Sequence, residues 1–222
     1  MASLETQTKF SRVTAARRSP SRYLWLVLGA LLAACSFWFD AAVQEWMTQQ
    51  QTPDARAFMR QVSWWGDWPA HVAVGLIGAA VSYAAGSRRW LGIFAAMVLA
   101  CAVAGIVNRA IKMGAGRARP SVEIDAGWNG PRLSSKYHAF PSGHTAATTG
   151  FFAALCFARP HVGLLFVLIP ILIAFSRMYL GAHHLSDVTC AALLGIIVAA
   201  LLTPVVQRRL DRARIADAEG AR

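Results

Sequence analysis

The sequence predicts an all-α membrane protein built as a bundle of six transmembrane helices. Of its 222 residues, 56% are hydrophobic and 15% are charged, whereas soluble domains are roughly 45–50% apolar and about 25% charged. Charge-free runs close to the ~20 residues that cross a bilayer recur along the chain. The composition excludes a disordered chain. It also speaks against a nucleic-acid partner, because the basic residues behind the net charge of +11 flank apolar runs.

The six spans follow in order from the charge-free runs. Four runs of 17 to 20 residues predict spans at 23–39, 68–87, 90–108 and 188–207. Two shorter runs, at 145–158 and 162–176, predict the remaining spans, because a chain already inserted in lipid has little other use for them. The spans divide the chain into a basic tail at 1–22, a membrane domain at 23–207 and a second basic tail at 208–222.

The first span has two interpretations. The sequence Leu32-Ala-Ala-Cys35 resembles a bacterial lipoprotein cleavage site that follows a signal peptide. An uncleaved anchor is favoured, because the basic segment before the span is 22 residues long and the apolar run continues through Phe37-Trp-Phe39. The other cysteines lie in apolar runs without a metal-binding spacing, so neither a metal site nor a disulfide framework is expected.

The basic residues predict the orientation. With both termini in the cytoplasm, that side carries 13 Lys and Arg against 4 acidic residues, as the positive-inside rule requires. The opposite side, which we expect to be the periplasmic face of a bacterial inner membrane, receives residues 40–67, 109–143 and 177–187. It also holds six cations that the rule would not place there: Lys112, Arg117, Arg119, Arg132, Lys136 and Arg177. These cations need a reason other than topology.

The first external connection predicts a short amphipathic helix. Thr52 is suited to cap it, Pro53 to occupy its first position, and Asp54 to lie in its first turn. Phe58, Val62 and Trp65 then recur at helical spacing. Plain anchoring at the membrane interface is the favoured role, and gating of a substrate is the alternative.

Segment 109–144 predicts an anion site. The glycines that follow Lys112 allow the backbone to bend so that Lys112 and Arg119 converge. Ser142, Gly143 and His144 then open the fourth span, so the free N–H groups of a helix start face the same space. This combination is typical of a phosphate site. The alternative is a capped helix start beside a basic loop that lipid headgroups solvate.

Segment 176–187 adds a histidine, a carboxylate and a further cation. His183 and Asp187 are four residues apart, so in the first turn of the last span the carboxylate would accept from one imidazole nitrogen and leave the other free. His184 has Val188 at that spacing and lacks such a partner. Arg177 offers a planar guanidinium for phosphate. So many cations with one carboxylate disfavour a divalent metal.

The three segments together resemble a known family. Lys112-x6-Arg119-Pro120, Pro141-Ser-Gly-His144 and Ser176-Arg177-x5-His183-x3-Asp187 are similar, in order and spacing, to the signature of the type 2 phosphatidic acid phosphatase superfamily. These are integral-membrane lipid phosphate phosphatases related to vanadium haloperoxidases. The resemblance implies a metal-independent and cofactor-free mechanism, in which His183 attacks phosphorus and forms a phosphohistidine while Asp187 holds its tautomer. His144 would protonate the leaving oxygen. The implied phosphate ligands are Lys112, Arg119, Ser142, Gly143 and Arg177.

The resemblance leaves several substrates open. It implies an amphiphile of phosphatidic acid, phosphatidylglycerol phosphate, undecaprenyl pyrophosphate or lipid A type. The lipid-facing helices and the loop 121–140 would select among them. A lipid phosphotransferase on the same scaffold is the main alternative. A non-enzymatic anion transporter is weaker, because the centres of the spans contain no charged residues.

Overall fold

The structure is a computed structural model that describes residues 20–122 and 127–220, and this part of the chain is helical. Apart from an isolated β-bridge between Arg117 and Trp128, the described residues form no strand. The α-helices are α1 (Pro20–Trp38), α2 (Asp40–Gln49), α3 (Pro53–Trp65), α4 (Trp68–Ala84), α5 (Arg88–Ala115), α6 (Gly143–Ala158), α7 (Pro160–Gly163), α8 (Leu168–Tyr179) and α9 (Leu185–Gly220). Two 3-10 turns lie at Ser135–Tyr137 and Leu164–Phe166. The all-α prediction is confirmed.

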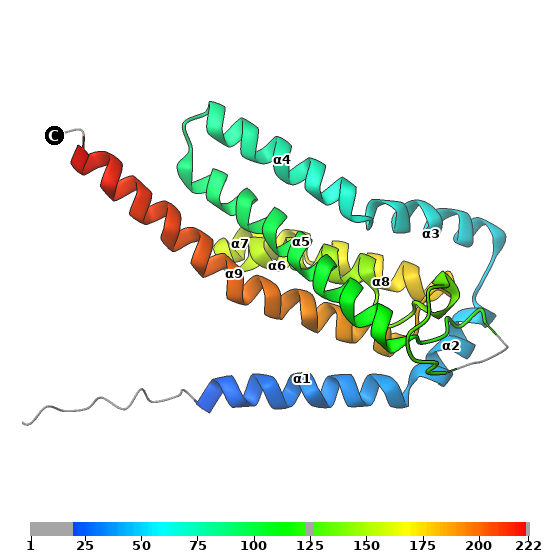
Figure 1. Ribbon diagram of the computed structural model, residues 1–222. Helices are drawn as coiled ribbons and strands as arrows, with labels where there is room; N and C mark the ends of the chain where they lie inside the picture. Colours follow the sequence, from blue (N-terminus) through cyan, green and yellow to red (C-terminus); the bar gives the residue numbers. More distant parts are fainter. Residues whose placement is uncertain (1–19, 123–126, 221–222) are drawn as a thin grey trace, which may run out of the picture.

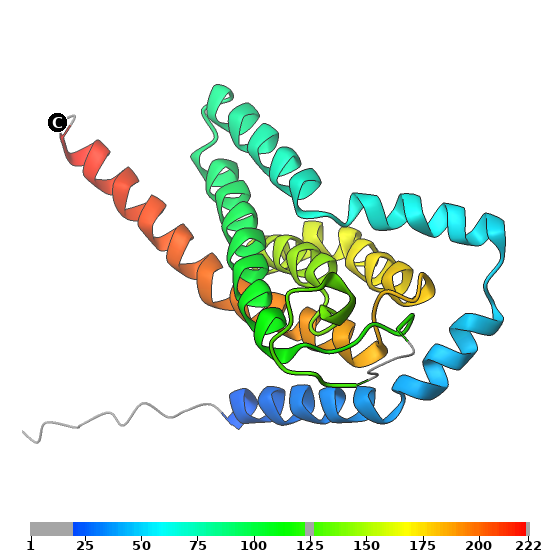
Figure 2. The ribbon, with the colours of Figure 1, turned by 45° about the vertical axis from the view of Figure 1, so that its right-hand side comes forward.

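Helices α5, α6 and α9 form the centre of the bundle, and α1 and α4 lie outside it (Figure 1). The end of α5, the start of α6, the end of α8 and the start of α9 meet at one end, together with the connection between α5 and α6 (Figure 2). The start of α1 and the end of α9 lie at the opposite end (Figure 1). The segments that carry the sequence motifs are therefore gathered at the end away from these two helix ends.

Close backbone contacts hold the central helix α6 between its two neighbours. A Cβ atom on Gly195 of α9 would lie 2.7 Å from the backbone nitrogen of Gly150 in α6. A Cβ atom on Gly150 would lie 2.9 Å from the carbonyl oxygen of Ala100 in α5. Real Cβ contacts are not this short, so glycine at both positions is what lets the three backbones approach. Alanine and buried aliphatic side chains fill the surrounding core.

Three helical segments are long and apolar enough to cross a membrane: Arg88–Ala115, Pro160–Tyr179 and Leu185–Leu210. The pair α1 and α2, which is bent by 56°, gives a fourth candidate if it counts as one span. Helix α4 is apolar but shorter. The chain is thus helical with three or four candidate spans in its described part, and the predicted total of six stays a prediction.

Several predicted boundaries differ from the structure. The first apolar helix is followed directly by α2, within the connection that the sequence predicts to be external. The last helix begins at Leu185 and continues through Pro204 to Gly220, so the predicted tail at 208–222 begins inside a helix. The predicted tail at 1–22 lies outside the described residues up to residue 19. The amphipathic helix is confirmed as α3, where the Thr52 hydroxyl accepts from the Ala55 N–H at 3.2 Å.

Candidate active site

A tight turn after α5 returns the chain toward the bundle. Gly116 ends the helix with a left-handed backbone (φ 57°), and a Cβ atom there would lie 1.5 Å from the Gly130 carbonyl oxygen. Only glycine fits this position. The Arg119 N–H then donates to the Lys136 carbonyl at 2.9 Å. The turn brings Arg119 back beside Lys112, as the sequence predicts, and the two cations interact electrostatically.

The start of α6 is fixed against the start of α9. The Ser142 N–H donates to the Asp187 carbonyl at 3.1 Å, and Ser142 is fully buried. The Thr145 hydroxyl donates to Ser142 Oγ at 3.1 Å. The first turn of α6 therefore presents Gly143 and His144 beside Lys112, whose Nζ would lie 3.7 Å from a Cβ atom on Gly143. Unpaired N–H groups at a helix start favour an anion in this position.

His183 is oriented by a backbone carbonyl. Its Nδ1 lies 2.7 Å from the Ala139 carbonyl oxygen, and the Ala139 N–H donates in turn to the Arg117 carbonyl at 3.0 Å. A carbonyl can only accept, so Nδ1 carries the proton and Nε2 is left with a free lone pair. Burial lowers the pKa of His183 to about 3, with the cations Arg177 and Lys112 acting in the same direction. The imidazole is therefore neutral near pH 7.

The prediction that His183 donates a hydrogen bond to Asp187 is wrong. Asp187 Oδ2 lies 3.7 Å from His183 Nδ1, because α9 begins at Leu185 and His183 precedes the helix. The carboxylate instead accepts from the backbone N–H of His184 at 2.7 Å and lies 3.1 Å from His184 Nδ1. His184 is the capping residue of α9, and Asp187 is the third residue of that helix. A side chain at the third position often accepts a hydrogen bond from the backbone N–H of the capping residue. The expectation that His184 lacks this partner is also wrong.

A buried ion network fixes Asp187 from the other side. Arg117 donates from Nη1 to Asp187 Oδ1 and from Nη2 to Asp40 Oδ2, both at 2.6 Å. Ser186 donates from its backbone N–H to Asp40 Oδ1 at 2.8 Å and from its hydroxyl to Asp40 Oδ2 at 2.6 Å. The guanidinium also lies over the rings of Phe37 and Trp128, 5.4 and 5.0 Å from their centroids. The N-terminal helices are thereby joined to the start of α9.

Arg177 and Arg119 each have a buried hydrogen-bond donor without a partner among the described residues. Arg177 Nη1 donates to Ser63 Oγ of α3 at 2.6 Å, which orients the guanidinium. The Nε atoms of Arg177 and Arg119 are buried and have no hydrogen-bond partner among the described residues. Burial lowers the pKa of Arg119, although a guanidinium stays charged at any ordinary pH. Buried donors without partners are costly, so this arrangement favours an anionic ligand.

An apolar cavity opens from this cluster between α4, α5 and α6. It has a volume of about 730 Å³ and is lined near the cluster by Asn108, Lys112 and His144. Farther from the cluster it is lined by Val72 and Ile106, among other apolar residues. A phosphate held by the cations could thus have an apolar substituent in this cavity.

The structure gathers the predicted site residues at one end of the bundle, on α5, α6, α8, α9 and their connections: Lys112, Arg119, Ser142, Gly143, His144, Arg177, His183 and Asp187. Residues near them that were missed or given no role include Asp40, Asp67, Asn108 and Arg117. Arg117 stood out in the sequence as a cation on an unexpected side. Its partner Asp40 is 77 residues away, and no local spacing indicates such a pair.

A family model, that of the PAP2 superfamily, matches residues 93–211. Two curated proteins named lipid A 1-phosphatase, from Rhizobium johnstonii and Rhizobium etli, are 34% and 33% identical over 125 residues, or 54% of this chain. The alignments cover 49% and 52% of those proteins. The chain thus spans about half the length of the curated relatives it matches.

Two crystal structures share the fold. The PAP2 type phosphatidylglycerolphosphate phosphatase from Bacillus subtilis is 20% identical, with a TM-score of 0.64 over 84% of this chain and 96% of that one. Aquifex aeolicus LpxE is also 20% identical, with a TM-score of 0.53 over 73% of this chain and 93% of that one. The Bacillus subtilis protein is described as transmembrane, and the apolar helices agree with an integral membrane protein.

Proposed function

The chain belongs to the PAP2 superfamily, and on this premise we propose that it hydrolyses the phosphate of a membrane lipid through a phosphohistidine on His183. The observation that carries the proposal is the position of His183, whose Nδ1 is held by the Ala139 carbonyl so that Nε2 is free, beside the cations and the start of α6. A nucleophile needs a free lone pair, and the cations would stabilise the charge on the phosphoryl oxygens.

In the first step, Nε2 of His183 would form a bond to phosphorus while the bond from phosphorus to the lipid oxygen breaks. His144 lines the cavity that receives the lipid, so it is placed to give its proton to that oxygen. Burial and the neighbouring Arg177 lower the pKa of His144 to about 4 in the free site, and a bound phosphate dianion would raise it again and favour the protonated form. In the second step, water would attack phosphorus, the bond to Nε2 would break, and His144 would take the proton from the water. Inorganic phosphate leaves and both histidines return to their starting state.

The ligands proposed for the phosphoryl oxygens are Lys112, Arg119, Arg177, the Ser142 hydroxyl and the Gly143 N–H. Losing one donor of this kind typically costs on the order of 3–4 kcal/mol of barrier. We propose that the reaction needs no metal, because both oxygens of Asp187 are already engaged by Arg117 and His184. Three cations would also repel a divalent ion.

A lipid substrate is supported by the cavity, whose apolar walls begin directly beside Lys112 and His144. The curated relatives are named for removal of a phosphate from lipid A, at 33–34% identity over about half their length. We therefore propose a phosphorylated saccharolipid of lipid A type as the first substrate to test. Phosphatidic acid, phosphatidylglycerol phosphate and undecaprenyl pyrophosphate follow it.

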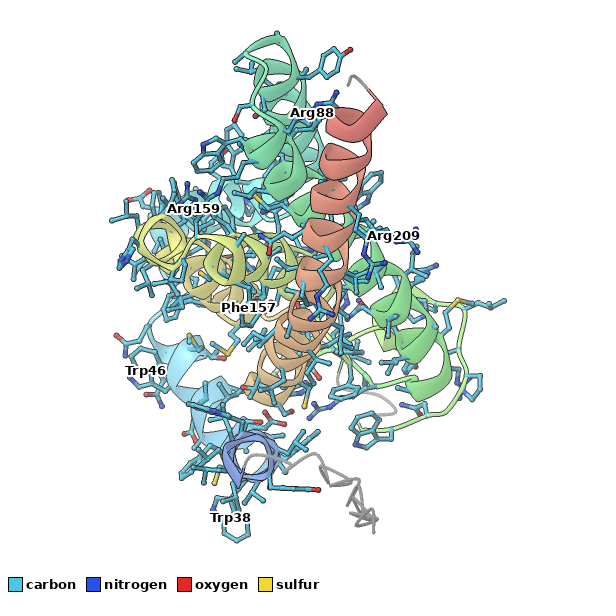
Figure 3. All side chains as sticks on the ribbon, turned by 90° about the vertical axis from the view of Figure 1, so that its left-hand side faces the viewer. Trp38, Trp46, Arg88, Phe157, Arg159 and Arg209 are labelled. Atoms are coloured by element: carbon cyan, nitrogen blue, oxygen red, sulfur yellow. The ribbon has the colours of Figure 1, made fainter. Side chains whose placement is uncertain are left out.

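We further propose six spans, with the site at the periplasmic face of a bacterial inner membrane. The support is the distribution of basic residues: Arg88 is the first residue of α5, Arg159 lies between α6 and α7, and Arg209 lies in the second half of α9, away from the site end (Figures 1 and 3). Labelling with a membrane-impermeant maleimide, in a cysteine-free background, would test this. Labelling of Ser134→Cys from outside and of Arg212→Cys only after lysis is expected; the reverse would contradict the orientation.

The function is tested by release of phosphate from this lipid panel, using detergent-purified protein in excess EDTA. Release by the wild-type protein and none by His183→Ala is the expected result, and a radioactive phosphoryl group should label wild type alone. Full activity of His183→Ala would refute the proposed nucleophile. Product analysis with and without an added lipid acceptor would distinguish hydrolysis from phosphotransfer.

A further inference from the structure

Asn108 is a buried amide without a partner. It lies on α5, one helical turn before Lys112, and only 2% of its surface is exposed. Its Nδ2 atom has no hydrogen-bond partner in the described part of the chain. Asparagine in the apolar stretch of a membrane helix is costly, because a buried N–H that lacks an acceptor loses its hydration without compensation. The position is therefore one where a ligand would complete the structure.

The amide lies at the junction of the charged cluster and the apolar cavity. It lines that cavity together with Lys112, Gly143 and His144. A Cβ atom on Gly143 would lie 3.5 Å from Asn108 Oδ1 and 3.7 Å from Lys112 Nζ, so the amide oxygen faces the first turn of α6. The oxygen is thereby directed toward positive groups, and the Nδ2 donor remains for a ligand in the cavity.

We propose that Asn108 Nδ2 donates a hydrogen bond to a neutral oxygen of the lipid beyond the scissile bond, such as an ester carbonyl or a sugar oxygen. This inference rests on the proposed function. The phosphate already has three cations, a hydroxyl and a backbone N–H as its proposed ligands, whereas Asn108 lies one helical turn from Lys112 on the cavity that would receive the leaving group. His144, the proposed acid for the leaving oxygen, lines the same cavity from α6. An acceptor a few atoms farther along the leaving group would lie where the cavity turns from polar to apolar.

The test compares two substrates that carry the same phosphate. Phosphatidic acid has ester oxygens close to the phosphate, while hexadecyl phosphate has an alkyl chain with no acceptor beyond the scissile oxygen. Asn108→Leu removes the donor at similar size, and Asn108→Ala removes it with a smaller side chain, so neither variant adds a charge. In both variants we expect kcat/KM for phosphatidic acid to fall roughly tenfold, as for one lost hydrogen bond. The value for hexadecyl phosphate should change less than twofold.

Thr149→Val is the matched control. Thr149 Oγ1 is another buried polar atom without a partner in the described residues, but it lies on α6 away from the cavity. Its removal should leave both substrates unaffected. An equal loss for both substrates in the Asn108 variants, or no loss for either, would overturn the inference. If the wild-type protein releases phosphate from neither substrate, the proposed function itself fails, and this inference with it.

Discussion

The ion network around Asp40 makes a prediction about stability. In Asp40→Ala, the structure loses the contact with Arg117 Nη2 and both hydrogen bonds from Ser186. The side chains of Arg117 and Asp40 are 9% and 11% exposed, so solvent screens their interaction weakly. The substitution therefore leaves a guanidinium largely buried with one of its two carboxylates missing.

The expected loss in the free energy of unfolding depends on the contacts that Arg117 keeps in the variant. Removing one partner of a buried ion pair typically costs about 3–5 kcal/mol. Arg117 keeps its 2.6 Å contact with Asp187, so we expect a loss in the free energy of unfolding near the lower end, about 3 kcal/mol. For a chain of this size that corresponds to a fall in Tm of roughly 6–12 °C. Asp40→Asn keeps an acceptor for the Ser186 N–H and should fall between Asp40→Ala and wild type.

Thermal unfolding of the detergent-solubilised variants measures this prediction. Glu45→Ala is the control, because Glu45 lies on the same helix and its 3.4 Å contact with Gln49 is exposed. Its free energy of unfolding should change by less than about 0.5 kcal/mol. Equal Tm values for Asp40→Ala and Glu45→Ala would show that the network does not stabilise the fold, and would refute the reasoning.

Three further predictions concern the nucleophile, the phosphate site and helix packing. Because burial lowers the pKa of His183 to about 3, its ring should stay neutral with the proton on Nδ1 from pH 5 to 8. Nitrogen NMR, with His183→Gln to identify the signal, checks this, and a titration near pH 6.5 would contradict it. Lys112→Ala should lower kcat by about 10²–10³ in phosphate release, while Arg60→Ala, on the exposed face of α3, should stay within twofold; similar losses would exclude a specific role for Lys112. Gly195→Val should destabilise the bundle by at least about 1–3 kcal/mol, since its side chain would meet the α6 backbone. Gly105→Val, with open space around a Cβ atom, should not lower Tm, and a comparable fall there would refute the packing argument.

The helical class could be predicted from the sequence because the thickness of the bilayer sets the length of a charge-free run that spans it. The same constraint says little about where a helix stops once it leaves the lipid. For this reason the span predicted at 188–207 is only part of α9, which continues to Gly220, and α2 was not anticipated. The cap at Thr52 was predictable because its partners are local.

The candidate site was also predictable only in part. The motifs indicated which residues meet, because each motif lies at a helix end on the same side. They did not indicate the partner of each atom, since His183 Nδ1 is held by Ala139, 44 residues away, rather than by the neighbouring Asp187. A spacing of four residues predicts a contact only inside a helix. The partner of His183 Nδ1 is a backbone carbonyl, and a sequence motif cannot indicate which backbone carbonyl will accept a hydrogen bond.

The glycine contacts between α5, α6 and α9 bear on two requirements of a lipid enzyme: accurate placement of the phosphate ligands and room for the hydrocarbon chains. Lys112, the first turn of α6 and the start of α9 belong to three helices whose backbones lie close together, so these helices cannot move closer without a clash. The remaining wall of the cavity comes from the first turns of α4, at Trp68 and Val72. A shift of that wall would change the room for hydrocarbon chains without altering the distances around phosphorus. Accuracy in the chemistry and tolerance of different chain bulk would then be set by different helices and could vary independently.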